Sequence, residues 1–146
     1  MTELKIGERI LIQLPDGFVK APIPWLTAWV AALRSGNYKQ GRGQLRVNDE
    51  YCCLGVLCTI QGGVAVPYND AGKFRFDGNM TSLSVYNPCY EVLNGDGSFP
   101  RDVDVFLTIS GTRRRCRALD ELNDSYATFE EIAGVIEALW SQKEGP

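Results

Sequence analysis

The segment near the C-terminus constrains the fold most tightly. Thr128 and Glu131 have the spacing of a capping box, in which each side chain accepts a hydrogen bond from the other residue's backbone N–H group. The residues that follow place apolar side chains at helical spacing: Phe129, Ile132, Ala133, Ile136, Leu139 and Trp140. The pattern predicts an amphipathic helix that starts at this cap, and we expect residues 142–146 to form a flexible tail.

A second helix is predicted over residues 24–35. Pro24 suits the first helical position, where its missing N–H group costs nothing, and Gly36 suits a left-handed C-cap. Apolar residues again recur at helical spacing: Trp25, Leu26, Trp29, Val30 and Leu33. We expect both tryptophans in the core; an exposed tryptophan that stacks on a base is the alternative.

The N-terminal residues favour a β-hairpin. Residues 5–14 are mostly β-favouring, Pro15-Asp16-Gly17 is a turn signal, and residues 18–21 return as a short strand. Pro22 and Pro24 then stop further sheet pairing.

A very apolar segment follows the second predicted helix. Residues 44–47 favour a strand, and residues 51–60 are apolar almost throughout. We expect a strand near 50–53 and a buried helix from about 53 to 61, capped by Gly62. Gly55 in this helix would let another element approach closely.

From residue 63 to 112 the character changes, because turn signals separate short β-favouring runs such as Val103 to Ile109. Residues 118–122 then favour a short helix that ends at Asn123-Asp124-Ser125. The fold class that we expect is α+β. Residues 1–146 should form a single domain of small antiparallel sheets packed with about three to four helices, with an irregular, loop-rich middle region.

Composition excludes several kinds of function. The chain contains no histidine, which removes the commonest general base and the imidazole ligand of metal sites. Its net charge of −3 argues against general nucleic-acid coating but leaves room for a local basic site. No stretch approaches the roughly 18 apolar residues of a membrane span, and no signal-peptide core is present. We therefore expect a cytoplasmic protein.

The five cysteines are interpreted as reduced, buried small hydrophobes. No C-x-x-C spacing indicates a metal or redox site, and a nucleophilic cysteine lacks a histidine base. Asp102 and Asp104 share one face if their segment is a strand, but as a metal or acid–base pair they are a weak signal. We expect no catalytic residue, no metal and no cofactor.

Two basic segments are the best candidates for a site. Residues 36–43 contain three glycines, and backbone N–H groups of a glycine-rich loop can cradle an anion. Residues 112–117 carry a run of arginines, and eight of the fifteen Lys and Arg residues lie in this run and in residues 34–46. If the segments meet, they form one anion site. The alternatives are a solvated turn for the loop and the solvated face of a helix for the arginine run, and both are favoured slightly.

Residues 33–58 (LRSGNYKQGRGQLRVNDEYCCLGVLC) and 119–139 (LDELNDSYATFEEIAGVIEAL) resemble a group of small proteins of tailed phages and prophages. In that group an L-R-S-G-x-Y-x-Q-G segment precedes C-C-L-G-V-L-C, and an L-N-D motif precedes a T-F-x-x-I-A helix. The group has no established function. The resemblance implies a phage origin, action inside the host bacterial cell, and a protein that acts by binding, often against a host defence.

Three functions follow from these observations. The first is a non-enzymatic anti-defence protein that captures a phosphate-bearing, nucleotide-type ligand, with forked arginine contacts to phosphate and a tyrosine that stacks on a base. The second is an inhibitor that masks a host defence protein or a nucleic-acid-binding complex, through acidic loops in residues 69–104. A metal-dependent enzyme is the weakest. The sequence is also compatible with a homo-oligomer. The candidate ligand-binding residues are Arg34, Tyr38, Lys39, Arg42, Arg46, Arg113, Arg115, Asn123 and Asp124, although a turn or cap role is favoured for the last two.

Overall fold

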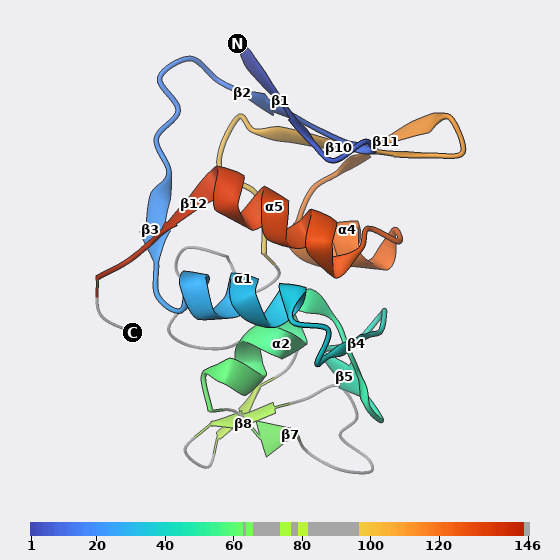
Figure 1. Cartoon of the computed structure of the whole chain (residues 1–146). Coiled ribbons are helices and arrows are strands. Elements are labelled where there is room, and N and C mark those ends of the chain that lie inside the picture. The colour runs from blue at the N-terminus through green and yellow to red at the C-terminus, as the bar shows by residue number, and fades with distance from the viewer. Residues whose placement is uncertain (63, 66–73, 77–78, 82–96, 145–146) are drawn as a thin grey trace.

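The computed structural model describes residues 1–62, 64–65, 74–76, 79–81 and 97–144. Its largest sheet is antiparallel and contains β1 (Thr2–Ile6), β2 (Ile10–Leu14), β10 (Asp104–Ile109) and β11 (Thr112–Cys116), in that order. Figure 1 shows this sheet on one side of the molecule. The helix α5 (Phe129–Leu139) lies next to it, followed by α1 (Leu26–Arg34) and α2 (Cys53–Ile60). The architecture is α+β, as predicted.

The N-terminal hairpin differs from the prediction. Residues 7–9 form its turn, with Gly7 at φ 61°, so the segment predicted as one strand is divided into β1 and β2. The turn at Pro15 is present, because the Phe18 N–H donates to the Pro15 carbonyl at 3.2 Å. It does not return the chain to the sheet, and residues 18–20 form no strand. The left-handed glycine reverses the chain earlier than the β-favouring composition suggested.

The chain also stays attached beyond the last helix. Trp140 is extended rather than helical and begins β12 (Trp140–Gln142), which pairs in parallel with β3 (Ala21–Ile23). The Lys143 N–H donates to the Ile23 carbonyl at 2.9 Å. The prediction of a tail from residue 142 is therefore wrong for Gln142 and Lys143, because sheet pairing continues past the helix; residues 145–146 lie outside the described residues.

The arginine run is a strand and not a helical face. Ser110 and Gly111 both have positive φ, 51° and 81°, which gives a tight hairpin between β10 and β11. Leu107 pairs with Arg114, and Leu107 is fully buried on the side of the sheet that faces the helices. Because side chains alternate along a strand, Arg114 points to the helix side and its two neighbours point to the opposite face.

The helices carry most of the core. Four helices are present among the described residues, the fourth being α4 (Leu119–Asp124). The predicted capping box at Thr128 is confirmed, and every apolar residue of the α5 stripe is buried. The α1 helix begins later than predicted, because Trp25 adopts a left-handed φ of 67° before it. Trp29 is fully buried and donates from its indole to the Cys53 carbonyl at 2.8 Å, while Trp25 packs half-buried against the core.

Short strands complete the described fold. One small sheet has the order β4-β6-β5, with β4 (Lys39–Gln40), β6 (Glu50–Tyr51) and β5 (Arg46–Val47). Another contains β7 (Val64–Ala65), β8 (Phe74–Phe76) and β9 (Asn79–Thr81). Most other features predicted between residues 63 and 96 lie outside the described residues. Within the described part of the chain, no helix is long and apolar enough to cross a membrane.

Candidate functional site

The segment that directly follows the glycine-rich loop is held against α2 by close backbone packing. A Cβ atom at Gly55 would lie 1.9 Å from the Leu45 carbonyl oxygen, so only glycine fits at this point of the helix. This confirms the close approach predicted at Gly55. The Gly41 N–H donates to the Tyr51 carbonyl at 2.7 Å, which ties the loop to β6. The loop is therefore part of the scaffold along much of its length.

Asn123 binds the glycine-rich loop to the end of α4 through side-chain hydrogen bonds. Its side chain is fully buried, and its Nδ2 donates to the Gly41 carbonyl at 2.8 Å. Its Oδ1 accepts from Gln40 Nε2 at 3.0 Å and from the Cys53 N–H at 3.2 Å, at the start of α2. Every polar atom of this amide thus has a protein partner, as buried polar groups require. Asn123 positions the loop, and its side chain is not exposed to a ligand.

Asp124 holds the next part of the loop and remains exposed. Its Oδ1 accepts from the Gly43 N–H at 2.9 Å. The neighbouring Arg42 extends its guanidinium over the Tyr126 ring, 4.1 Å from the centroid. These contacts place the glycine-rich loop beside the turn that joins α4 to α5.

Most predicted cations near the loop already have anionic or aromatic partners. Arg34 forms ion pairs with two α5 carboxylates, Glu130 at 2.7 Å and Glu137 at 2.8 Å, and these raise its pKa. Lys39 pairs with Glu50 at 3.3 Å. Such partners lower the charge that these residues offer to a phosphate.

The tyrosine of the loop is packed as well. Tyr38 meets Tyr51 edge to face, with ring centroids 5.2 Å apart, and it packs half-buried against the core. The Arg46 guanidinium lies over the Tyr51 ring, 5.1 Å from its centroid. The Arg46 side chain also donates to the Asn48 carbonyl at 2.6 Å. The loop therefore does not present the open cluster of cations and tyrosine that the sequence suggested.

Arg113 and Arg115 lie on the outer face of the large sheet. Arg115 forms an ion pair with Asp104 at 2.8 Å, and Arg113 lies over the Phe106 ring at 5.4 Å. The structure does not bring these two side chains into one site with the glycine-rich loop, because they point away from the helices.

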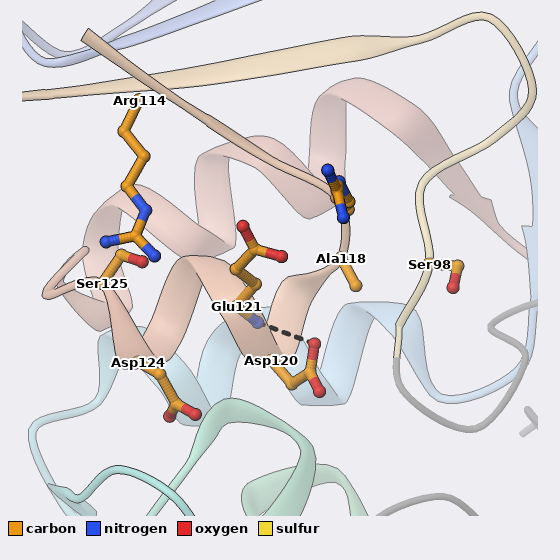
Figure 2. A pocket seen from close by; sticks show the side chains of 8 residues that line it. Ser98, Arg114, Ala118, Asp120, Glu121, Asp124 and Ser125 are labelled. Atoms are coloured by element: carbon orange, nitrogen blue, oxygen red, sulfur yellow. Dashed lines mark hydrogen bonds between the residues drawn. The ribbon is translucent and has the colours of Figure 1, made fainter.

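The opposite face of the same segment lines a pocket. The pocket has a volume of about 460 Å³ and lies along α4 and the chain that leads into it. Figure 2 shows Arg114 reaching from β11 toward Ser125, with Asp120, Glu121 and Asp124 on the helix below. Its lining residues are Ser98, Arg114, Arg117, Ala118, Asp120, Glu121, Asp124 and Ser125.

The two arginines of this pocket are available for a ligand. Both are exposed, and in the described part of the chain neither forms an ion pair. They face three carboxylates from α4, so the pocket combines a cationic side with an acidic side. The sequence indicates the arginine run as a whole but does not select Arg114 and Arg117 within it; once residues 112–116 are read as a strand, the two-residue alternation separates Arg114 from its neighbours.

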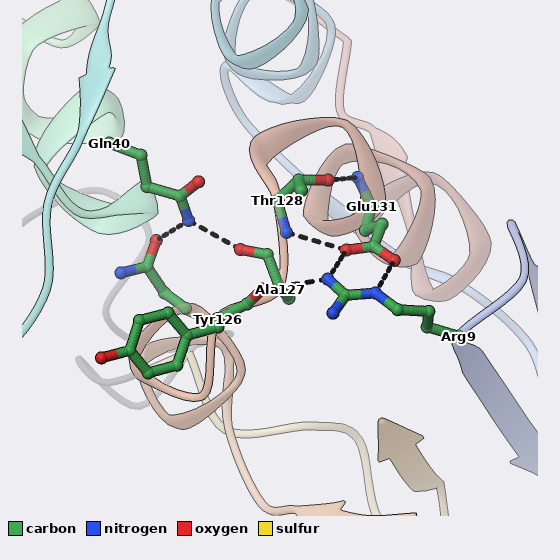
Figure 3. Close-up of polar contacts among 7 residues, drawn as sticks. Arg9, Gln40, Tyr126, Ala127, Thr128 and Glu131 are labelled. Carbon is green, nitrogen blue, oxygen red and sulfur yellow. Dashed lines mark hydrogen bonds and ion pairs between the residues drawn. The ribbon is translucent and has the colours of Figure 1, made fainter. Parts of the chain in front are cut away.

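A second polar network fixes the turn beside the pocket. Arg9 binds Glu131 through two nitrogens, at 3.0 and 2.6 Å, and donates to the Tyr126 carbonyl at 2.9 Å (Figure 3). Burial of Glu131 opposes ionisation, but the hydrogen bonds from Arg9 and Thr128 outweigh it, and the pKa of Glu131 is lowered. Arg9, which the sequence analysis did not single out, thus joins the large sheet to the α4–α5 turn.

The cysteines carry no site chemistry among the described residues. Cys52, Cys53, Cys58 and Cys116 are buried, as predicted, and form no disulfide with one another, while Cys89 lies outside the described residues. Burial raises the pKa of Cys52 to about 12 and that of Cys53 well above its ordinary value. No group of three or more metal-ligating side chains occurs in the described part of the chain.

The described residues form a small α+β domain with a charged pocket along α4. Next to this pocket, the buried Asn123 side chain holds the glycine-rich loop; we call this contact the amide clamp. Residues 26–140 match the family model of a domain of unknown function, DUF8296, and the chain belongs to this family. No curated protein and no solved structure matches the chain.

Proposed function

We propose that this protein is a non-enzymatic binding protein that captures a phosphate-bearing, nucleotide-type ligand in the pocket between β11 and α4. The observation that carries the proposal is the pair Arg114 and Arg117, two exposed arginines on the wall of a pocket that form no ion pair with any residue the structure describes. Arginine binds phosphate oxygens through forked, charge-assisted hydrogen bonds.

The acidic side of the pocket complements the rest of such a ligand. Asp120, Glu121 and Asp124 present carboxylate oxygens, which accept hydrogen bonds from hydroxyl and amino groups. Ribose hydroxyls and base amino groups are donors of this kind. A bare phosphate would meet these carboxylates with repulsion, so the lining favours a ligand that has a phosphate at one end and donors at the other.

Capture without reaction agrees with the composition, because a chain without histidine lacks the usual acid–base group. The resemblance to phage proteins supports an anti-defence role in the bacterial cytoplasm, in which the protein removes a host signalling nucleotide. The masking of a host protein depended on acidic loops in residues 69–104, most of which lie outside the described residues.

A thermal-shift screen with matched ligands tests the proposal. The panel pairs each nucleotide with its nucleoside, for example adenosine 5′-monophosphate with adenosine, and adds cyclic dinucleotides and inorganic phosphate. A nucleotide at a hundred times its dissociation constant should stabilise the protein by about 2.7 kcal/mol, and its nucleoside should not. No stabilisation by any phosphate-bearing compound, or equal stabilisation by nucleoside and nucleotide, would overturn it.

A further inference from the structure

Tyr126 is an aromatic side chain that the fold presents to solvent. It is 63% exposed, whereas most large apolar side chains among the described residues are buried or half-buried. Its backbone has a φ of 75°, a left-handed conformation that costs a non-glycine residue free energy and is concentrated at functional sites. The core gains little from this ring, so packing does not explain its position.

The backbone around this ring is fixed on both sides. The Tyr126 N–H donates to the Asn123 carbonyl at 3.3 Å, and its carbonyl accepts from Arg9 at 2.9 Å. Arg9 is itself held by Glu131, in the capping box of α5. Figure 3 shows the Tyr126 ring extending away from this network. The ring therefore projects from an anchored turn.

One side of the ring is already in contact with a cation. The Arg42 guanidinium lies 4.1 Å from the ring centroid. The other tyrosines of this region, Tyr38 and Tyr51, pack against each other and against the core. Tyr126 is thus the aromatic side chain of this region that has the surface left for a planar ligand.

Tyr126 is next to the pocket lining in the chain. Tyr126 directly follows Asp124 and Ser125, both of which line the pocket. Asp124 also binds the Gly43 N–H, and Gly43 follows Arg42, whose side chain covers the ring. The Asp124 side chain thus connects the wall of the pocket to the loop whose Arg42 covers the Tyr126 ring.

We propose that Tyr126 is the base-stacking residue of this protein, with Arg42 supporting the ring. The inference rests on the proposed nucleotide capture and assigns the aromatic part of the ligand to a residue outside the pocket lining. Stacking on an aromatic side chain tolerates any base, because every base has a π face. The ligand class is thus a nucleotide, in preference to a sugar phosphate or a phosphorylated peptide.

Two probes with the same phosphate separate this inference from the proposed function. Affinities for adenosine 5′-monophosphate and ribose 5-phosphate are measured by calorimetry on wild type, Tyr126→Leu and Tyr126→Phe. Leucine keeps apolar bulk without a π face, and phenylalanine keeps the ring. We expect Tyr126→Leu to bind the nucleotide roughly tenfold more weakly and the sugar phosphate unchanged, and Tyr126→Phe to match wild type for both.

The other possible results of these measurements would overturn the stacking role. An unchanged nucleotide affinity in Tyr126→Leu, or an equal loss for both probes, would overturn the stacking role while leaving phosphate capture in place. Failure of wild type to bind either probe would overturn the stacking role, whereas phosphate capture is overturned only if no nucleotide or phosphate of the thermal-shift panel stabilises the protein. If Tyr126→Leu does not fold, a 2-aminopurine nucleotide decides the question: its fluorescence should be quenched by wild type and by Tyr126→Phe but not by Tyr126→Asn, and equal quenching by all three overturns the inference.

Discussion

Asn123 donates from Nδ2 to the Gly41 carbonyl oxygen at 2.8 Å across 82 positions of sequence. This contact joins the L-N-D motif before the last helix to the glycine-rich loop after the first one. Asp124, the next residue of the motif, holds the Gly43 N–H. Residues 33–58 and 119–139 are therefore held together in the fold, and the motif fixes the loop beside the pocket.

The amide clamp predicts that alanine substitutions at two adjacent residues, Asn123 and Asp124, differ strongly in their effect on the free energy of unfolding. Asn123→Ala leaves the Gly41 carbonyl and the Cys53 N–H without their side-chain partner in the core, and we expect a loss of about 3 kcal/mol or more in the free energy of unfolding. Asp124→Ala removes one exposed contact and should cost about 1 kcal/mol or less. Urea denaturation of both variants measures this, and equal losses would show that Asn123 does not act as a clamp.

Gly55 and Gly134 are both helical and give a matched test of backbone packing. A Cβ at Gly55 would meet the Leu45 backbone, which cannot move aside, so Gly55→Ala should cost more than about 3 kcal/mol or prevent folding. A Cβ at Gly134 would meet the Cγ2 methyl group of the half-buried Ile6 at 2.6 Å. That side chain can shift, and alanine favours a helix, so Gly134→Ala should change stability by about 1 kcal/mol or less. Thermal unfolding of the two variants compares their stabilities. A larger loss in Gly134→Ala than in Gly55→Ala would contradict the backbone packing at Gly55.

The Arg9–Glu131 ion pair predicts a pH dependence. The folded-state pKa of Glu131 is lowered, so its stabilising effect is present at neutral pH and is lost as pH falls from the unfolded-state value, about 4.3, through the folded one. Glu131→Gln preserves the capping geometry but removes the charge, and should cost about 1 kcal/mol at pH 7. Unfolding curves of both proteins should converge as the solution is acidified below pH about 4; a difference that is constant with pH would rule out this linkage.

Buried thiols predict slow labelling of the folded protein. The described cysteines are buried, and burial raises the pKa of Cys52, Cys53 and Cys116, so thiolates are scarce at pH 8. A thiol reagent should label at most one of the five cysteines rapidly in the native state and all five in urea. A Cys89→Ser variant assigns any rapid site. Rapid labelling of two or more native cysteines would contradict the burial of the described cysteines.

Local patterns predicted the helices well, and the reason is physical. The capping box of α5 and the apolar stripes of α1 and α5 depend on residues a few positions apart. The sequence does not show that Ser110 and Gly111 form a hairpin turn. Without this turn, the face of the sheet on which each following arginine lies cannot be assigned.

The candidate site depends on pairs that no single sequence displays. The charges of Arg34 and Lys39 are met by Glu130 and Glu50, and the choice of partner follows from the packing of separate elements. For this reason the sequence shows the basic segments but not which of their cations form ion pairs with other described residues. Arg114 and Arg117 emerge only when the sheet is in place.

The most direct measurement of phosphate capture uses the two faces of the arginine run. Arg114→Ala/Arg117→Ala removes both pocket arginines, while Arg113→Ala/Arg115→Ala removes the same charge from the outer face of the sheet. All four side chains are exposed, so both variants should fold. By calorimetry with the nucleotide that stabilises wild type most, the pocket variant should lose about a hundredfold in affinity and the outer-face variant less than about threefold. Equal losses in the two variants, or a larger loss in the outer-face variant, would contradict the account.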